Sequence, residues 1–271
     1  MPTTPSRPSL IVSTSDNPVA LDLVLEGLSL QSRAPAELLI ADDGSDDVTK
    51  QVIRKWSARF AFPVHHFWQP HVGFRKTVIL NRTVRDSTGD YLIFIDGDCL
   101  PHRHFIADHL RHAAPRTFVQ GRRAGIRSRY VRHVSPRRLH PLFLFLTRRL
   151  YGLKRGLRRP WALVRVNDRS LIQGCNFAVW RDDFFRVNGY DESFVGWGHE
   201  DTELAERLCN AGLTCKTIVG QAIVYHLDHP RVARYRTHVN ERILERTKRE
   251  KRIRCERGIT LETATTPWPS M

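Results

Sequence analysis

The chain has few cysteines and no long apolar run, and one long stretch has almost no acidic side chains. Its 271 residues include five cysteines, at positions 99, 175, 209, 215 and 255, and no two of them have the C-x-x-C spacing. A scattered, odd-numbered set is typical of reduced thiols in a cytosolic protein. The cysteines therefore exclude a disulfide framework and a zinc site built on paired cysteines.

The missing apolar run argues against a membrane-spanning helix, which needs roughly 18 consecutive apolar residues. Residues 1–9 are polar and rich in proline, and they lack the apolar core of a signal peptide. Hydrophobic residues make up 41% of the chain and charged residues 26%, which is ordinary for a soluble globular protein. We therefore expect one large or two small domains, located in the cytoplasm.

Acidic side chains are scarce in residues 121–170, where Asp168 stands among fifteen arginines and lysines. Residues 231–257 hold eleven basic residues and four acidic ones. The formal net charge of the whole chain is +15. The basic character therefore belongs to these two segments and not to the protein as a whole.

The first hundred residues alternate between apolar strand patterns and amphipathic helix patterns. Strands are expected at 10–12, 38–41, 64–68 and 90–96, and helices at 19–30, 46–60 and 76–85. Strands separated by single helices predict a parallel sheet with right-handed crossovers. In such sheets ligands bind beyond the carboxyl ends of the strands.

Polar clusters follow three of these strands, at Ser13–Asp16, Asp42–Ser45 and Asp96–Asp98. The last cluster places two carboxylates one residue apart at a strand end, where they can hold a hard divalent cation. The alternative is that these residues only form a turn. The carboxylates of Asp42 and Asp43 can accept hydrogen bonds from a base or a ribose, and the alternative is a helix cap.

Further candidates lie on other segments. Arg75 and Lys76 can hold diphosphate oxygens at the same sheet edge, although a solvated basic turn is the alternative. The glycine-rich segment Gly196–Asp201 precedes an expected helix at 200–211 and contains an acid pair. In that segment Trp197 offers an apolar face for a sugar ring, while Asp201 is a candidate base or a helix cap.

The second half is less regular. Strands are expected at 171–180 and over most of 214–225, followed by a charged helix at 232–257 and a loose tail from 258. After the second of these strands, His226 or His229 is a candidate third ligand for the cation.

Taken in order, these motifs resemble family-2 glycosyltransferases of the GT-A fold. The second half resembles the galactosyltransferase-type C-terminal module of chondroitin-polymerase-like and bacterial polysaccharide enzymes. The resemblance covers about residues 9–120 and 170–230. It rests on Asp42–Ser45, Asn81, Gly89–Tyr91, Asp96–Asp98, Gly174–Asn176 and Gly196–Asp201.

The resemblance implies an α/β fold with a Rossmann-like, mostly parallel sheet flanked by helices and a smaller sheet on the acceptor side. It implies inverting transfer of a hexose or N-acetylhexosamine from a UDP-sugar to a hydroxyl group, with Mn²⁺ or Mg²⁺. Asp201 would be the catalytic base with Glu200 beside it, and Asp98 and His226 would hold the metal. The residues implied in nucleotide-sugar binding are Thr14, Asp42, Asp43, Arg75, Lys76, Asp96, Gly97, Asp98 and Trp197.

The chain departs from the family pattern at one place. Ile79-Leu80-Asn81 stands where Ala-Arg-Asn is common in the family. The usual arginine contact must therefore come from Arg75, Lys76 or Arg82, or be absent.

Residues 121–170 are not explained by this resemblance. Their apolar run Leu142–Leu146 is flanked by arginines and suits a helix lying in an anionic membrane interface. The acceptor would then be a membrane-anchored glycan (lipopolysaccharide core, capsule or lipid-linked saccharide), and the protein would be peripheral to the inner face of the cytoplasmic membrane. A solvated basic loop over an apolar lid is the alternative.

Other classes of protein are also open. Clustered arginines with aromatics are typical of nucleic-acid binding, but no recognition motif accompanies them, so we do not expect a nucleic-acid partner. A nucleic-acid- or membrane-binding protein without transferase activity on the same scaffold remains the alternative.

The predicted division is a flexible N-terminus (1–8), a nucleotide-sugar-binding half (9–120), a basic amphipathic insertion (121–170), an acceptor and catalytic half (171–230), and a basic helix and tail (231–271).

Overall fold

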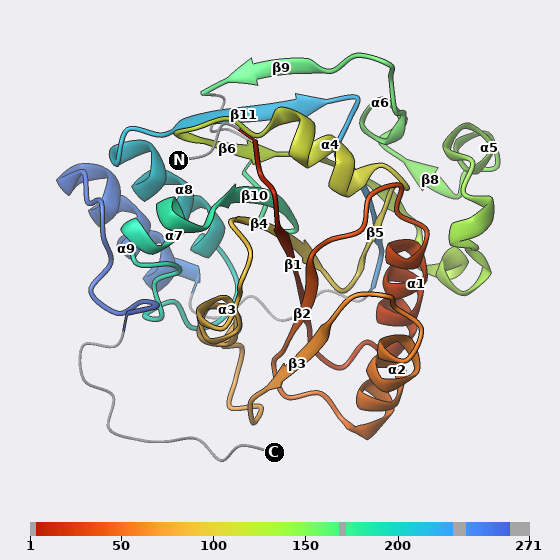
Figure 1. The fold of residues 1–271 in the computed structure, drawn as a ribbon, viewed down its shortest axis with the longest axis horizontal. Coiled ribbons are helices and arrows are strands. Elements are labelled where there is room, and N and C mark those ends of the chain that lie inside the picture. The colour runs from red at the N-terminus through yellow and green to blue at the C-terminus, as the bar shows by residue number, and fades with distance from the viewer. Residues whose placement is uncertain (1–3, 168–171, 230–236, 261–271) are drawn as a thin grey trace.

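The computed structural model describes residues 4–167, 172–229 and 237–260, which form two sheets surrounded by helices (Figure 1). The larger sheet has the strand order β3-β2-β1-β4-β10-β6-β11-β9. Its first four strands are parallel to one another: β1 (Pro8–Thr14), β2 (Glu37–Asp42), β3 (Val64–Trp68) and β4 (Tyr91–Asp96). The four strands predicted in this region are confirmed.

The connecting helices cover both faces of the larger sheet. On one face α1 (Pro18–Ser29) and α2 (Asp47–Ser57) pack together, and α3 (Lys76–Arg85) lies on the other face (Figure 1). Asn17 and Asp46 cap the first two helices by accepting hydrogen bonds from the backbone N–H three residues on. All three predicted helices are confirmed, and their positions leave the carboxyl ends of the strands open for polar side chains.

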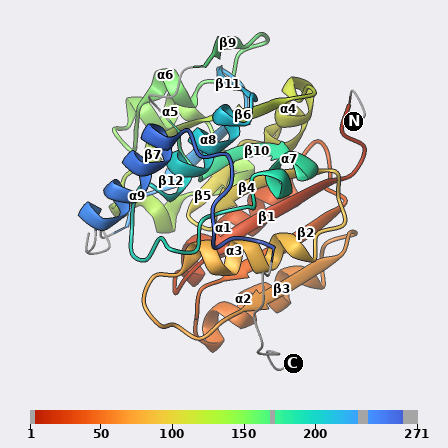
Figure 2. The same cartoon turned by 90° about the vertical axis from the view of Figure 1, so that its left-hand side faces the viewer.

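The second half completes the larger sheet with strands of both directions. β10 (Asn176–Trp180) lies antiparallel between β4 and β6 (Thr117–Gln120), and β11 (Thr214–Val219) runs parallel to β6. The edge strand β9 (Leu163–Val166) is antiparallel to β11. Helices of this half include α4 (Phe105–His112), α7 (Arg181–Arg186) and α8 (Glu200–Asn210). Figure 2 shows this half above β1, β2 and β3.

The smaller sheet has the order β5-β12-β7-β8. Its strands are β5 (Cys99–Pro101), β12 (Ile223–Leu227), β7 (Arg122–Ile126) and β8 (Leu150–Tyr151). The single strand expected over most of 214–225 is thus two strands in different sheets. Gly220 and Ala222 separate them with positive φ angles of 90° and 48°, which a continuous strand does not allow.

The described part of the basic segment, residues 121–167, is paired into both sheets through β7, β8 and β9. Between these strands lie the short helices η1 (Ser128–His133), η2 (Pro136–Arg138), α5 (Pro141–Leu146) and α6 (Leu153–Gly156). Within α5, Leu144 is buried, while four apolar neighbours are 42–71% exposed: Leu142, Phe143, Phe145 and Leu146. The helix therefore presents most of its apolar side chains outward.

The charged helix α9 (Thr237–Glu250) packs against α8 (Figure 2). It ends before Arg257, where the sequence pattern placed its end. The chain then folds back, so that Cys255 and Ile259 are buried and the Ile259 N–H donates to the Asn188 carbonyl at 2.9 Å. The expectation of a loose tail is therefore wrong for residues 258–260, and residues 261–271 lie outside the described part.

In the described part no helix is long and apolar enough to cross a membrane.

Candidate active site

The first polar cluster lies where β1, β4 and α3 meet. Asp96 ends β4, and its Oδ1 accepts hydrogen bonds from the Ser13 hydroxyl and the Lys76 ammonium, both at 2.6 Å. The side chain of Lys76 is 14% exposed. The parallel pairing of β1 with β4 and the start of α3 thus bring two of the predicted donor-site residues together at one sheet edge.

Lys76 also faces the acid pair of α8. Burial alone would lower the pKa of Lys76, but the negative charges of Asp96, Asp201 and Glu200 raise it well above its usual value. The ammonium group therefore stays charged. It is the cation that links the end of β4 to the start of α8.

The acid pair begins α8 after a glycine-rich loop. Gly196, Gly198 and His199 have positive φ angles of 83°, 111° and 72°, which turn the chain sharply into the helix. Glu200 is buried and its Oε2 accepts the Gly198 N–H at 3.1 Å. Burial, together with the nearby Asp201 charge, raises the pKa of Glu200 to about 7.

Asp201 is held by a second glycine segment. Its Oδ2 accepts the Gly174 N–H at 2.9 Å, and its Oδ1 is buried without a hydrogen-bond partner in the described part of the chain. A Cβ atom at position 174 would lie 1.9 Å from that Oδ1. Burial raises the pKa of Asp201 although the Lys76 charge opposes it. Gly174 thus holds one oxygen of Asp201, and the other has no hydrogen-bond partner among the described residues.

Asp98 faces a different group from Asp96. β4 ends at Asp96, and the chain turns at Gly97–Asp98 into the smaller sheet. The Asp98 Oδ2 lies 2.9 Å from His229 Nε2 and 3.4 Å from His226 Nε2. The two carboxylates at the end of β4 therefore have different partners, Ser13 and Lys76 for Asp96 and the two histidines for Asp98.

The Asp98 cluster fits a divalent cation. Asp98, His226 and His229 can each offer a ligand atom, and these atoms lie within 4.8 Å of one another. Burial would raise the pKa of Asp98, but hydrogen bonds from His226 and His229 outweigh it and hold the pKa far below its usual range. A carboxylate that stays ionised beside two imidazoles is a suitable donor set for such a cation. Both histidines that the sequence left open are therefore present at the site.

Asp42 and Asp43 make more hydrogen bonds within the protein than the sequence suggested. Asp42 is fully buried, and its two oxygens contact the Ser45 N–H at 2.9 Å and His66 Nε2 at 2.8 Å. The oxygens of Asp43 accept from Gln69 Nε2 at 2.6 Å and from the Arg75 N–H at 2.8 Å. Both carboxylates therefore stabilise the loops at this edge, and only their remaining lone pairs can serve a ligand.

The other predicted residues lie around the same edge. The carbonyl of Thr14 accepts the Asp43 N–H at 2.9 Å, and Gly97 lets the turn approach β1, with its N–H 2.6 Å from the Ser13 carbonyl. The Arg75 guanidinium donates to the Pro70 carbonyl at 3.0 Å. Trp197 is 41% exposed in the loop before α8.

The sequence analysis did not identify Arg123 as a residue of this site. Arg123 on β7 lies 3.8 Å from Cys175 Sγ through its Nη1. Burial would lower the pKa of Arg123, but Cys175, Cys99, Asp96 and Asp98 raise it, so the guanidinium stays charged beside the Asp98 cluster. No local pattern signals this role, because it depends on the pairing of β7 with the distant strand β12.

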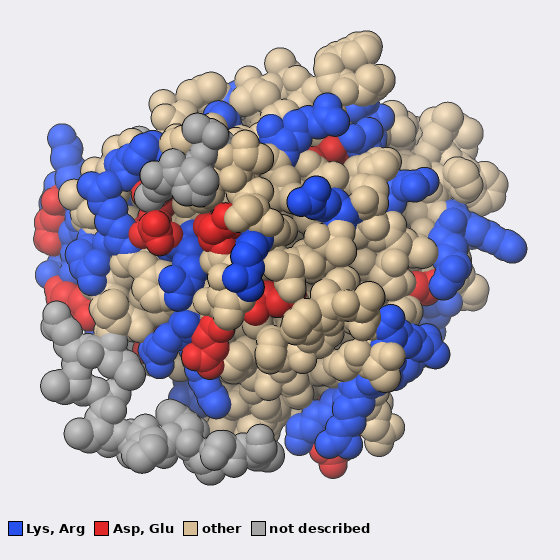
Figure 3. Space-filling view, viewed as in Figure 1, with Lys and Arg blue, Asp and Glu red and all other residues tan. Residues whose placement is uncertain are grey.

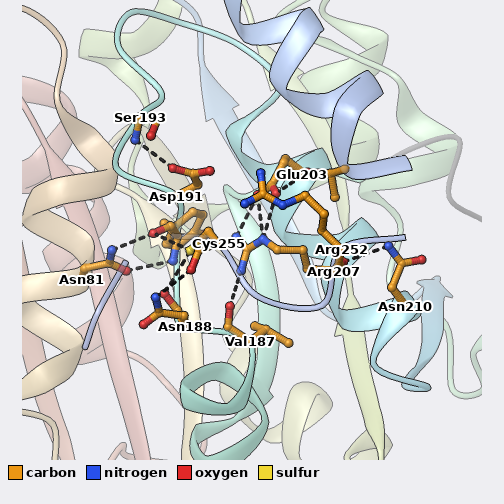
Figure 4. Close-up of polar contacts among 12 residues, drawn as sticks. Asn81, Val187, Asn188, Asp191, Ser193, Glu203, Arg207, Asn210, Arg252 and Cys255 are labelled. Carbon is orange, nitrogen blue, oxygen red and sulfur yellow. Dashed lines mark hydrogen bonds and ion pairs between the residues drawn. The ribbon is translucent and has the colours of Figure 1, made fainter. Parts of the chain in front are cut away.

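Asn81 has a structural role beneath the site (Figure 4). Its Nδ2 donates to the Tyr190 carbonyl and its Oδ1 accepts the Tyr190 N–H, both at 2.8 Å. Asn81 is fully buried. It therefore ties α3, which begins with Lys76, to the loop that leads into α8.

The fold is that of GT-A glycosyltransferases. Among solved structures, S. aureus TarS has a TM-score of 0.62 at 13% identity, covering 91% of this chain and 41% of that one. The mannosyltransferase PcManGT from Pyrobaculum calidifontis, in complex with GDP-Man and Mn²⁺, has a TM-score of 0.57 at 18% identity, covering 92% and 62%. GalNAc-T7 with UDP, GalNAc and Mn²⁺ has a TM-score of 0.59 at 14% identity, covering 84% and 44%. The predicted fold class is confirmed.

The chain belongs to glycosyl transferase family 2, whose profile matches residues 9–172. A second profile, described as the N-terminal domain of galactosyltransferase, matches residues 165–230. The family match runs through residues 121–170, which the resemblance had left out.

Two relatives illustrate the range of this family. Validoxylamine A glucosyltransferase of Streptomyces hygroscopicus subsp. limoneus is 28% identical over 235 residues, which cover 76% of this chain and 48% of the relative. Chondroitin synthase of Pasteurella multocida is 22% identical over 246 residues, which cover 82% and 25%. This chain therefore spans half or less of the length of these relatives.

Proposed function

We propose that this protein transfers a hexose or N-acetylhexosamine from a UDP-sugar to a hydroxyl group of a glycan acceptor, with inversion and with a divalent cation. The observation that carries the proposal is the convergence of Asp96, Lys76 and Asp201 at one edge of the larger sheet, next to the Asp98 cluster. The enzymatic relatives support the reaction class, although they are longer than this chain.

Lys76 and Arg75 would bind the diphosphate of the donor. Lys76 is charged and only 14% exposed, so its attraction to an anion is screened less than that of a fully exposed lysine. Its present partner, Asp96, would then be released to accept a ribose hydroxyl. Trp197 would stack on the sugar or the acceptor through its exposed indole face.

Asp201 would act as the general base. Its Oδ1 takes the proton of the acceptor hydroxyl as the new glycosidic bond forms, while Gly174 holds Oδ2 in place. Attack from the face opposite the leaving diphosphate inverts the anomeric centre, so an α-linked donor gives a β-glycoside. Glu200 keeps a second, partly protonated carboxyl beside the base.

Asp98 and His226, with His229 beside them, would hold the cation. When bound, it would neutralise negative charge on the departing nucleoside diphosphate. A mixed carboxylate and imidazole set favours Mn²⁺ over Mg²⁺, which prefers oxygen ligands.

The acceptor would be a membrane-anchored cell-surface glycan, and the protein would be peripheral to the inner face of the cytoplasmic membrane. Support comes from the outward apolar side chains of α5 and from the basic residues around it. Figure 3 shows lysines and arginines on the right-hand edge of the molecule, below the place of α5 in Figure 1, and others on its left-hand side. A basic, apolar surface of this kind binds anionic lipid.

The test is a thermal-shift screen of nucleotide sugars with and without Mn²⁺. A donor that binds the folded state raises the melting temperature, by mass action. We expect one UDP-sugar to raise it in the presence of Mn²⁺, and Asp98→Asn to lose the Mn²⁺-dependent part of the shift. A panel in which no nucleotide sugar shifts the wild-type protein contradicts the proposal.

A further inference from the structure

His226 belongs to a row of residues that are paired across the smaller sheet. In register, Cys99 on β5 pairs with His226 on β12, His226 pairs with Gly125 on β7, and Gly125 pairs with Tyr151 on β8. Residues directly opposite one another on neighbouring strands share a face of the sheet. The row therefore joins the Asp98 cluster to β8, which lies in the basic segment 121–170.

Because Gly125 has no side chain, the Tyr151 side chain can cross this row. A Cβ atom at position 125 would lie 2.0 Å from Cζ and 2.2 Å from the hydroxyl oxygen of Tyr151. The tyrosine ring therefore lies directly over the Gly125 backbone, which only glycine permits. In this position the Tyr151 hydroxyl reaches past β7 and donates to Asp228 Oδ1 at 2.8 Å.

Asp228 connects the tyrosine to the histidine. Its Oδ1 also lies 3.0 Å from His226 Nδ1, and the other ring nitrogen, Nε2, lies 3.4 Å from Asp98 Oδ2. A carboxylate at Nδ1 favours a proton on that nitrogen, so Nε2 is the nitrogen that faces Asp98 and that can exchange its proton for a cation. Metal-binding histidines commonly have this arrangement of partners.

We propose that Asp228 and Tyr151 are positioning residues that hold His226 with Nε2 toward the cation bound by Asp98. Gly125 makes the arrangement possible by leaving room for the tyrosine. The inference rests on the proposed metal-dependent function, and it gives the basic segment a direct part in the catalytic site. It also assigns the ligand role to His226, through an oriented Nε2.

The first test measures Mn²⁺ binding alone, from the electron paramagnetic resonance signal of free Mn²⁺ during titration. Loss of an outer partner of a metal ligand weakens affinity by about 10–100-fold. We expect a loss in this range for Asp228→Ala and a loss near its lower end for Tyr151→Phe. Gly125→Ala should match Tyr151→Phe, because the added methyl group displaces the ring.

The matched control is Tyr130→Phe, which removes a hydroxyl from the same segment. The ring of Tyr130 lies under Arg129 and Arg149, so we expect wild-type affinity. Melting temperatures measured in chelator identify any variant whose fold is impaired. Tyr151→Phe keeps the ring and is the decisive variant if Asp228→Ala or Gly125→Ala fails to fold.

The second test needs no metal. Nitrogen-15 spectra of labelled histidine, taken well above the usual histidine pKa of about 6.5, should show His226 protonated at Nδ1. Asp228→Ala should weaken that preference. A wild-type His226 without a proton on Nδ1 overturns the inference whatever the metal does.

The binding outcomes separate the two proposals. Wild-type Mn²⁺ affinity in Tyr151→Phe and Asp228→Ala, with loss of binding in Asp98→Asn, overturns the positioning role and leaves the metal site standing. Wild-type affinity in Asp98→Asn as well removes the metal site and the inference together.

Discussion

Gly174 determines what Asp201 can do. Any side chain at position 174 would collide with the Oδ1 atom that we propose accepts the proton. The two motifs Gly174–Asn176 and Gly196–Asp201 are far apart in the sequence, yet they form one structural unit through the Gly174 N–H. A role for Gly174 as a mere turn residue would not require this contact.

Asp201→Asn should lower kcat by about 10²–10⁴-fold while the affinity for the donor changes little. A general base acts in the transition state and contributes little to ground-state binding. Calorimetry of donor binding and turnover on a soluble acceptor would measure the two effects. A collapse of donor affinity with unchanged folding would instead make Asp201 a binding residue.

Glu200 should make the protein less stable as the pH rises. Its pKa is about 7 in the folded state against an ordinary value of 4.5, so between these values the folded state binds more protons than the unfolded state. The free energy of unfolding therefore falls by roughly 3 kcal/mol between about pH 4.5 and pH 7 from this group. Glu200→Gln should remove that part of the slope.

Urea unfolding at several pH values would measure the slope for Glu200→Gln. The control is Glu241→Gln, which removes an equal charge from an exposed position on α9. If the slope of Glu200→Gln equals that of the wild type, the carboxyl group is not protonated in the folded protein.

Among the helices, α8 depends on a buried ion pair (Figure 4). Glu203 and Arg207 are joined by three contacts of 2.8–3.0 Å, and their side chains are 1% and 0% exposed. The Thr247 hydroxyl on α9 donates to Glu203 Oε1 at 2.9 Å. This pair fixes α8 below the acid pair that starts it.

Removing one partner should destabilise the protein by about 3–5 kcal/mol, because it leaves a buried charge unpaired. Arg207→Met and Glu203→Leu should each have this effect in chemical denaturation. The double substitution should cost clearly less than the sum of the two, since no charge is left buried. Additive losses would show that the charges do not compensate each other.

The regular elements of the first half could be predicted because local periodicity fixes them. β3 and α3 have the bounds that the sequence indicated. β7, β8 and β9 could not be predicted, since each is defined by pairing with a distant strand. For the same reason the sequence did not predict that Asp96 and Asp98 contact different groups. Their partners depend on where β5 joins the smaller sheet.

The sequence predicted which motif residues meet at the site, but it did not predict their partners. The motif residues Lys76, Asp96 and Asp201 meet at one edge because parallel strands and helix starts place them there. The partners of those residues were not predictable. His66 beside Asp42 and Tyr151 beside Asp228 come from strands whose neighbours no local pattern reveals.

For the chain taken together, the exposed apolar helix α5 and its cations predict binding to anionic vesicles. Replacing four exposed cations with glutamine should weaken binding by roughly 4 kcal/mol if all reach the headgroups. The four are Arg138, Arg148, Lys154 and Arg155. Arg158 is spared because its guanidinium binds Asp108 at 2.7 and 3.0 Å, and its loss would disturb the fold.

Vesicle co-sedimentation with and without anionic lipid would measure this effect, which should fade in high salt. The control removes four exposed cations from α9: Arg242, Arg246, Lys248 and Arg249. Equal pelleting of the wild type and the α5 variant contradicts a membrane role for this surface. Sequence-dependent DNA binding by the wild type would favour a nucleic-acid partner.

The contacts that α9 and the residues after it make with the loop and helix of the acid pair also bear on how the protein folds during synthesis. Asn240 donates to the Val195 carbonyl at 3.4 Å, and Asn210 on α8 donates to the Arg252 carbonyl at 3.0 Å. Residues 240–260 leave the ribosome after the strands and glycine loops that they hold, and folding during synthesis proceeds from the N-terminal side. A nascent chain would thus form the parallel half of its larger sheet early and fix the start of α8 late.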